Sequence, residues 1–179
     1  DAYARTCLTM LADLAPALDR APEVPQIDRD HLGPIPRANL SLKLTSLVPR
    51  FDALHAETTT GPVLDRLRPI LREARRLGAF VNIDMEQYAH KDLTLDIVEG
   101  VLDEPEFRDW PGAGVVIQAY LRDSAADLER LRDWSRRRGT PITVRLVKGA
   151  YWDYEVLSAR QLGWPVPVFE RKAQTDANY

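Results

Sequence analysis

The 179-residue sequence has little of several features that would place it in a specialised class of protein. Its single cysteine, Cys7, cannot form an internal disulfide, and this usage favours a cytosolic protein. No stretch approaches 18 consecutive apolar residues, which argues against a membrane-spanning helix. The formal net charge of −3 excludes a basic tail for nucleic acid. Hydrophobic residues make up 45% of the sequence, which is enough to form the core of one globular domain.

Lysine and histidine are also scarce. Among the 24 basic side chains the only lysines are Lys43, Lys91, Lys148 and Lys172. Lysine is a compact point charge and arginine a planar fork, so the two are not equivalent at a binding site. Either the lysines mark such a site, or they are the chance survivors of a bias toward arginine. The three histidines lack the spacing of metal ligands, and we expect no bound metal.

The chain is predicted to have two parts. Residues 1–37 are expected to form a helix with an apolar stripe and then a proline-rich connection, because residues 16–36 hold five of the 13 prolines. Residues 38–179 are expected to form the main domain. The sequence begins at Asp1 without methionine or a signal-like segment. We therefore expect both ends to be interior points of a longer polypeptide.

Strand and helix patterns alternate through the main domain. The predicted strands cover residues 39–44, 80–85, 114–120 and 142–147. The predicted helices cover residues 62–77, 92–102, 124–139 and 153–162. In the first helix, Pro62 suits the first helical position and Gly78 the position just past the end. Strands separated by helices predict an α/β fold of about four consecutive parallel strand–helix units.

Two architectures are compatible with this order. A doubly wound sheet would be covered by helices on both faces, whereas a β/α barrel encloses side chains of alternate parity. Polar residues of the inward parity, such as Ser41, Lys43, Asn82 and Asp84, favour the barrel. No glycine-rich phosphate fingerprint follows any strand. Because a complete (β/α)8 barrel needs roughly 250 residues, we expect a partial TIM-type barrel.

Each predicted strand ends in polar or ionisable residues. They are Lys43, Asp84, Gln118 with Tyr120, and Arg145 with Lys148. The carboxyl edge of a parallel sheet is where ligands bind, because the loops there vary while the scaffold stays rigid. A structural ion-pair network, for example Lys43–Asp84–Arg145, is the alternative interpretation. We favour a functional site.

Several segments resemble one known family. They are LSLKLTSLVPRF, NIDME, GVVIQAYLR, RLVKGAYWDYE and WPVPVFERKAQTDANY. RLVKGAYWD and the downstream RK-x-x-T-D are the most specific. In order, from about residue 38 to residue 179, these segments resemble the FAD-dependent proline dehydrogenase domain of the bacterial bifunctional proline utilisation proteins.

The resemblance implies an activity and its partners. The family is a flavin-containing (β/α)8 barrel that oxidises L-proline to Δ1-pyrroline-5-carboxylate, the first step of proline catabolism to glutamate. Electrons pass from reduced FAD to a membrane quinone. The resemblance further implies a cytoplasmic protein, peripheral at the inner face of the bacterial membrane, and in many bacteria a fused aldehyde dehydrogenase domain.

The resemblance also assigns roles to residues. Lys43 matches the lysine that contacts the substrate carboxylate, Asp84 the active-site aspartate, and Arg145 the arginine beside flavin N5; these are the predicted catalytic residues. Tyr151 is a second predicted substrate contact. The predicted cofactor-binding residues are Met85, Gln118, Arg145, Lys148, Gly149, Ala150, Trp152, Lys172 and Thr175.

The sequence also departs from the family. The family's remaining strands, and a late helix with a tyrosine and paired arginines that clamp the proline carboxylate, have no counterpart in these 179 residues. We therefore expect the chain alone to be inactive. Two other functions stay open: a barrel lyase in which Lys43 or Lys148 forms a Schiff base, and a non-catalytic truncated scaffold unit.

Overall fold

The computed structural model describes residues 2–31 and 33–179. The N-terminal elements are α1 (Ala2–Asp19), α2 (Pro25–Asp28), β1 (Arg29–Asp30) and β2 (Gly33–Pro34). The main strands are β3 (Asn39–Leu42), β4 (Phe80–Ile83), β5 (Ala113–Gln118) and β6 (Thr143–Val147). The helices around them are α3 (Ala56–Arg76), α4 (Tyr88–Leu102), α5 (Ser124–Arg138), α6 (Trp152–Leu162) and α7 (Lys172–Asn178). Two short 3-10 turns, η1 (Leu44–Leu47) and η2 (Ala53–His55), lie between β3 and α3.

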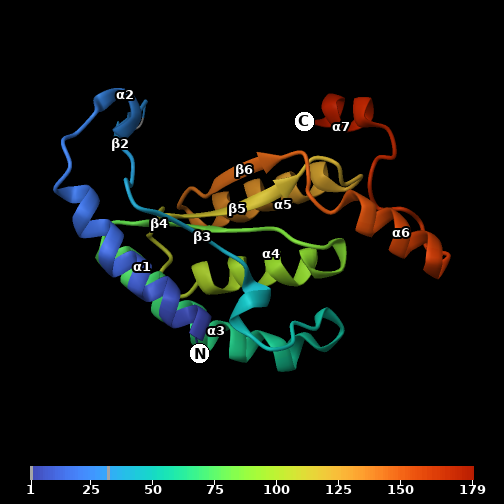
Figure 1. Cartoon of the computed structure of the whole chain (residues 1–179), viewed down its shortest axis with the longest axis horizontal. Coiled ribbons are helices and arrows are strands. Elements are labelled where there is room, and N and C mark those ends of the chain that lie inside the picture. The colour runs from blue at the N-terminus through green and yellow to red at the C-terminus, as the bar shows by residue number, and fades with distance from the viewer. Residues whose placement is uncertain (1, 32) are drawn as a thin grey trace.

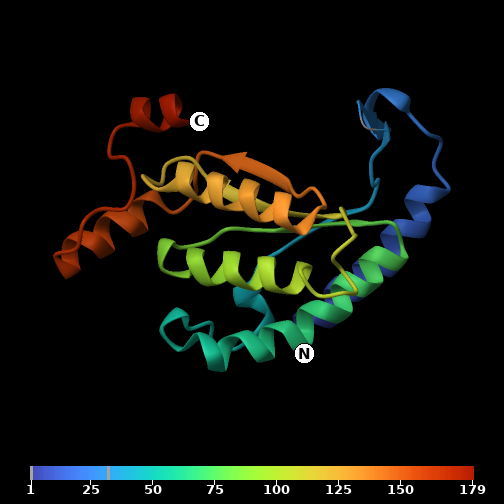
Figure 2. The same ribbon diagram turned by 180° about the vertical axis from the view of Figure 1, so that it is seen from behind.

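The main strands form one four-stranded parallel sheet in the order β3-β4-β5-β6. Leu40 of β3 lies opposite Val81 of β4, and Val115 of β5 lies opposite Val144 of β6. Helices α3, α4 and α5 lie along one face of this sheet (Figure 2), and the strands are seen from the other face in Figure 1. The arrangement confirms the predicted series of parallel strand–helix units.

The core lies between the sheet and these helices. Leu67 and Leu71 of α3 and Val98 of α4 approach Val81 and Ile83 of β4, and all five side chains are buried. Burying such a side chain contributes about 1.5–3 kcal/mol. The period-2 pattern predicted for the first strand is confirmed, because exposed and buried residues alternate along β3. This core is the rigid base from which the strand ends project.

The N-terminal connection is more ordered than its prolines predict. Helix α1 continues through Pro16, and α2 with the β1–β2 pair follows it. The guanidinium of Arg37 donates hydrogen bonds to the carbonyl oxygens of Leu18 and Ala21. Carbonyls at a helix end need such partners, so Arg37 caps α1 from a distant part of the sequence. The proline-rich connection therefore begins after Asp19 rather than at Pro16.

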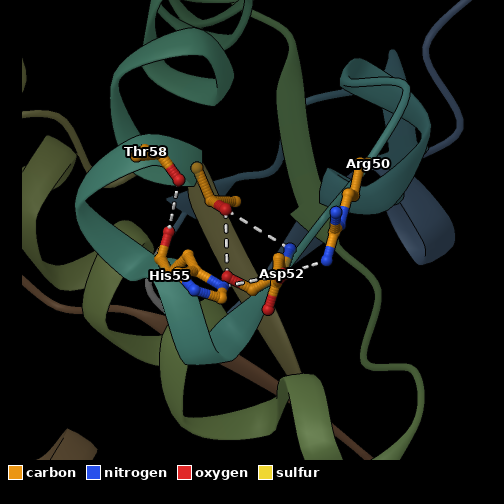
Figure 3. Close-up of a pocket in the computed structure, with 5 residues that line it drawn as sticks. Arg50, Asp52, His55 and Thr58 are labelled. Carbon is orange, nitrogen blue, oxygen red and sulfur yellow. Dashed lines mark hydrogen bonds and ion pairs between the residues drawn. The ribbon is translucent and has the colours of Figure 1, made fainter.

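Helix α3 begins at Ala56 and contains Pro62, so the prediction that the helix starts at Pro62 is wrong. The reason is a polar cluster just before the helix (Figure 3). Asp52 accepts the backbone N–H of Leu54 and contacts His55 Nδ1 at 3.0 Å. A side-chain oxygen that accepts a free N–H of a first turn caps that turn, here η2, and η2 leads directly into α3 ahead of Pro62.

Two further residues complete this cluster. Arg50 Nη2 donates to Asp52 Oδ2 at 2.7 Å, and Thr59 Oγ1 donates to the backbone oxygen of Asp52 at 2.9 Å. Thr59 is buried, so it joins the capping turn to the body of α3. The polar groups of this cluster thus bond to one another, which indicates a structural role.

No helix in residues 2–31 and 33–179 is long and apolar enough to cross a membrane.

Candidate functional site

The carboxyl ends of the main strands surround a hollow of about 370 Å³. We call it the first hollow. It is lined by Lys43, Asp84, Met85, Val116, Gln118, Arg145, Val147, Lys148, Gly149, Ala150 and Tyr151. All of the strand-end groups named from the sequence except Tyr120 therefore converge on one place, as expected for parallel strands.

An ion pair spans the floor of the first hollow. Arg145, on β6, extends across β5 so that its Nη2 donates to Asp84 Oδ1 at 2.5 Å. The same guanidinium donates to Ser41 Oγ at 3.3 Å, and Asn82 Nδ2 donates to Asp84 Oδ1 at 3.2 Å. The side chain of Arg145 is 49% exposed. The guanidinium is thus held by strands β3 and β4 while remaining open to a ligand.

Lys43 does not join that ion pair. Its Nζ lies 3.4 Å from the hydroxyl of Tyr151, which also lines the first hollow. The hydrogen bond to Tyr151 raises the pKa of Lys43. Lys43 is therefore a stable cation, suited to an anion such as a carboxylate. A Schiff-base nucleophile needs a lowered pKa, so the direction of this shift disfavours the lyase alternative.

Gln118 leaves one polar atom without a partner. Its side chain is 2% exposed, and its amide nitrogen donates to the backbone oxygens of Met85 and Glu86 at 3.3 Å. Its carbonyl oxygen Oε1 is buried and accepts no hydrogen bond from the described residues. A buried acceptor without a donor is costly unless a ligand supplies one. Gln118 thus fits a ligand that carries an N–H group, such as a flavin ring.

A second hollow of about 310 Å³ adjoins the first and shares Lys148 and Gly149 with it. It is lined by Tyr120, Lys148, Gly149, Trp152, Phe169, Glu170, Lys172 and Thr175. The indole N–H of Trp152 donates to the backbone oxygen of Phe169 at 2.9 Å, which fixes one wall. Two connected hollows suit an elongated ligand with two ring systems.

Gly149 shapes the boundary between the hollows. Its φ is +130°, and a Cβ there would lie 2.5 Å from the ring of Tyr120. Only glycine permits both this conformation and this close approach. Burial raises the pKa of Tyr120.

Two lysines of the second hollow share one carboxylate. Lys148 Nζ pairs with Asp176 Oδ1, and Lys172 Nζ donates to Asp176 Oδ2 at 2.5 Å. The pair with Lys148, reinforced by Lys172, holds the pKa of Asp176 below its usual range. Asp176 is not among the predicted site residues. Its spacing of four residues from Lys172 on one helix is the signal that could have indicated it.

The remaining lysine lies outside both hollows. Lys91 is buried and pairs with Asp127 at 2.6 Å, Asp92 at 3.0 Å and Asp123 at 3.2 Å. It joins α4 to α5, which is a structural role.

Every predicted site residue lies at one of the two hollows, whereas the functional role of each stays a prediction. Phe169, Glu170, Val116 and Val147 line the hollows as well; they lie within the segments that carry the family resemblance, but none was assigned a role. Within residues 2–31 and 33–179, no group of three or more acidic, histidine or cysteine side chains is arranged to hold a metal ion.

Comparison with known proteins gives a consistent family assignment. The family model described as proline dehydrogenase matches residues 1–179. The bifunctional protein PutA of Escherichia coli (strain K12) is 36% identical over 141 residues, which are 78% of this chain and 11% of that protein. Proline dehydrogenase 1 of Bacillus subtilis (strain 168) is 38% identical over 114 residues, 64% of this chain and 32% of that one.

A solved structure resembles the fold over nearly the whole chain. Proline utilization A (PutA) from Bdellovibrio bacteriovorus, inactivated by N-propargylglycine, superposes with a TM-score of 0.96 and 47% identity, covering 99% of this chain and 18% of that one. The four parallel strand–helix units thus correspond to part of a TIM-type barrel, as predicted. The chain spans about 11% of the length of the curated PutA relatives.

Proposed function

The chain belongs to the proline dehydrogenase family, and from this premise we propose that it contributes four strands to an FAD-dependent catalytic barrel. The proposed reaction is the oxidation of L-proline to Δ1-pyrroline-5-carboxylate. The observation that carries the proposal is the convergence of Lys43, Asp84, Gln118 and Arg145 on one hollow.

The two hollows suit the two halves of FAD. When bound, FAD would supply the oxidant that accepts a hydride equivalent from the proline carbon beside the nitrogen. We propose that Gln118 and Met85 hold the ring system in the first hollow. Lys148 and Gly149, which line both hollows, and the adjacent Ala150 would hold the phosphates. The remaining proposed contacts, in the second hollow, are Trp152, Lys172 and Thr175.

Lys43 supplies a cation to the first hollow, and we assign it to the proline carboxylate together with Tyr151. A charge-assisted contact there orients the substrate, and orientation accounts for a large part of catalysis in such reactions. The pKa of Lys43 is raised, so this anchor remains charged at neutral pH.

Arg145 provides fixed positive charge on the floor of the first hollow. Because Asp84 and Ser41 hold its guanidinium, little reorganisation is needed when negative charge develops nearby. In this scheme Asp84 holds Arg145 in place and keeps the net charge on the floor of the first hollow near zero.

The family resemblance supports a wider assignment. We propose that electrons leave for a membrane quinone, with the parent protein cytoplasmic and peripheral at the inner face of the bacterial membrane. We also propose that an aldehyde dehydrogenase domain completes the conversion to glutamate, since the PutA relatives are named bifunctional.

The test is an anaerobic absorption spectrum of the polypeptide that carries this chain in its natural context, before and after L-proline. We expect flavin bands that bleach with L-proline and persist with D-proline. A folded protein without flavin bands would overturn the proposal. Flavin bands that L-proline does not change would support flavin binding and overturn the assignment of L-proline as the substrate. Borohydride trapping of a carbonyl substrate on Lys43 or Lys148 would instead support the lyase.

A further inference from the structure

A buried carboxylate outside the proposed contacts lies close behind the first hollow. Glu155, on α6, is 6% exposed, and burial raises its pKa. Its Oε1 accepts the backbone N–H of Tyr88 at 2.7 Å. Among the described residues Glu155 forms no ion pair, so its burial is compensated by this backbone contact.

The donor is the first residue of α4. The opening N–H groups of a helix have no partner within the helix, and the residue before α4, Gln87, makes no side-chain cap in the described structure. The N-terminus of a helix also carries partial positive charge. Glu155 therefore caps α4 from a different helix, through hydrogen bonding and charge.

This cap joins two loops that both line the first hollow. Asp84 and Met85 lie just before α4, and Tyr151 immediately precedes α6. Tyr88 is three residues beyond Met85, and Glu155 is four residues beyond Tyr151. A change at the cap is therefore separated from the lining residues of both loops by only a few residues of chain.

We propose that Glu155 is a positioning residue that fixes the spacing of the 84–87 and 148–151 loops, and thereby the affinity of the first hollow for flavin. The inference rests on the proposed function. Glu155 itself does not line either hollow. It acts through Tyr88 on one loop and through its own helix on the other.

The test compares matched variants in the full natural polypeptide. Glu155→Ala removes the acceptor, whereas Glu155→Gln keeps an oxygen that can accept the N–H of Tyr88. Tyr88→Pro removes the donor at a first helical position, where proline is well tolerated, and Gln87 has the extended backbone that precedes proline readily. Tyr88→Ala is its control, because it also loses the ring but retains the N–H.

The measurements are the FAD dissociation constant, the flavin absorption spectrum and the melting temperature of the flavin-free protein. If the hydrogen bond between Glu155 and Tyr88 sets the shape of the first hollow, losing it should weaken FAD binding by roughly tenfold or more, the usual effect of losing a hydrogen bond to a charged group. We expect that loss, with a shifted flavin spectrum, for Glu155→Ala and Tyr88→Pro. Glu155→Gln and Tyr88→Ala should stay within about threefold of wild type.

Two results would overturn the inference while the proposed function stands. One is a lower melting temperature for Glu155→Ala and Tyr88→Pro with unchanged flavin affinity, because the cap would then be structural only. The other is a Glu155→Gln variant as weak as Glu155→Ala, because the hydrogen bond would then be irrelevant. If the wild-type protein binds no flavin, the proposed function fails and the inference fails with it.

Discussion

At the scale of single residues, Gly149 is the position where backbone and side chain constrain the site most tightly. Its φ is +130°, and a Cβ at this position would lie 2.5 Å from the ring of Tyr120, which leaves no room for another residue. We expect Gly149→Ala to cost about 1–3 kcal/mol of backbone strain and to displace the loop between the hollows. Flavin affinity should fall together with the melting temperature.

The control for this prediction is Gly163→Ala. Gly163 also has a positive φ, +66°, but nothing lies within 4 Å of a Cβ there. The control should lose stability, by about 1–2 kcal/mol, without losing flavin affinity. Equal effects of the two variants on flavin affinity, measured by fluorescence titration, would show that the contact between Gly149 and Tyr120 is unimportant.

The location of the site residues could be predicted because parallel strands bring their carboxyl ends to one edge. Lys43, Asp84 and Arg145 lie far apart in sequence, yet Lys43 and Asp84 each directly follow a strand of the sheet, and Arg145 lies within the last strand, β6. Asp176 and Glu155 could not be predicted in this way. Their partners, Lys148 and Tyr88, are set by how α6 and α7 pack, which no local pattern records.

At the scale of elements, the helix boundaries show which local signals outweigh others. Gly78, with φ +64°, does lie just past the end of α3, as predicted, because glycine adopts the left-handed conformation there without strain. The start of α3 differs from the prediction because Pro62, which resembles a start signal, lies inside the helix. Asp52 instead caps η2, and α3 follows η2 directly at Ala56.

This cluster predicts a pH dependence of stability. The hydrogen bond to His55, followed by the N–H of Leu54, lowers the pKa of Asp52 from its usual value of 3.8. A lowered pKa in the folded state means that the stabilisation is present above the usual pKa and is lost as the pH falls through the folded-state pKa. We expect Asp52→Asn to lower the melting temperature by a few degrees at pH 7. The difference from wild type should shrink below about pH 4.

The matched control is Asp65→Asn, further along α3, whose side chain is 77% exposed and lies 3.9 Å from Arg68. Exposed pairs of this kind contribute little, so its melting temperature should follow wild type at every pH. A difference between Asp52→Asn and wild type that is constant from pH 7 to pH 3 would contradict the role of the Asp52 carboxylate.

At the scale of the whole molecule, the four-stranded sheet leaves β3 and β6 each paired on one side only in the described structure. The proposed site therefore lies on an open face, where the side chain of Arg145 is 49% exposed. Flavin and substrate chemistry benefits from excluded water, which strengthens the electrostatic contacts of groups such as Arg145 and Lys43. An open face cannot provide that exclusion.

We therefore expect the 179 residues on their own to show no proline-dependent dye reduction, even with added FAD. The E. coli PutA relative, assayed in parallel, is the positive control. The unpaired edges of β3 and β6 should also make the isolated chain prone to self-association, which size-exclusion chromatography would detect. Turnover by a monomeric isolated chain would mean that these four strands already hold and shield the reacting groups, and that closure of the barrel is needed for stability alone.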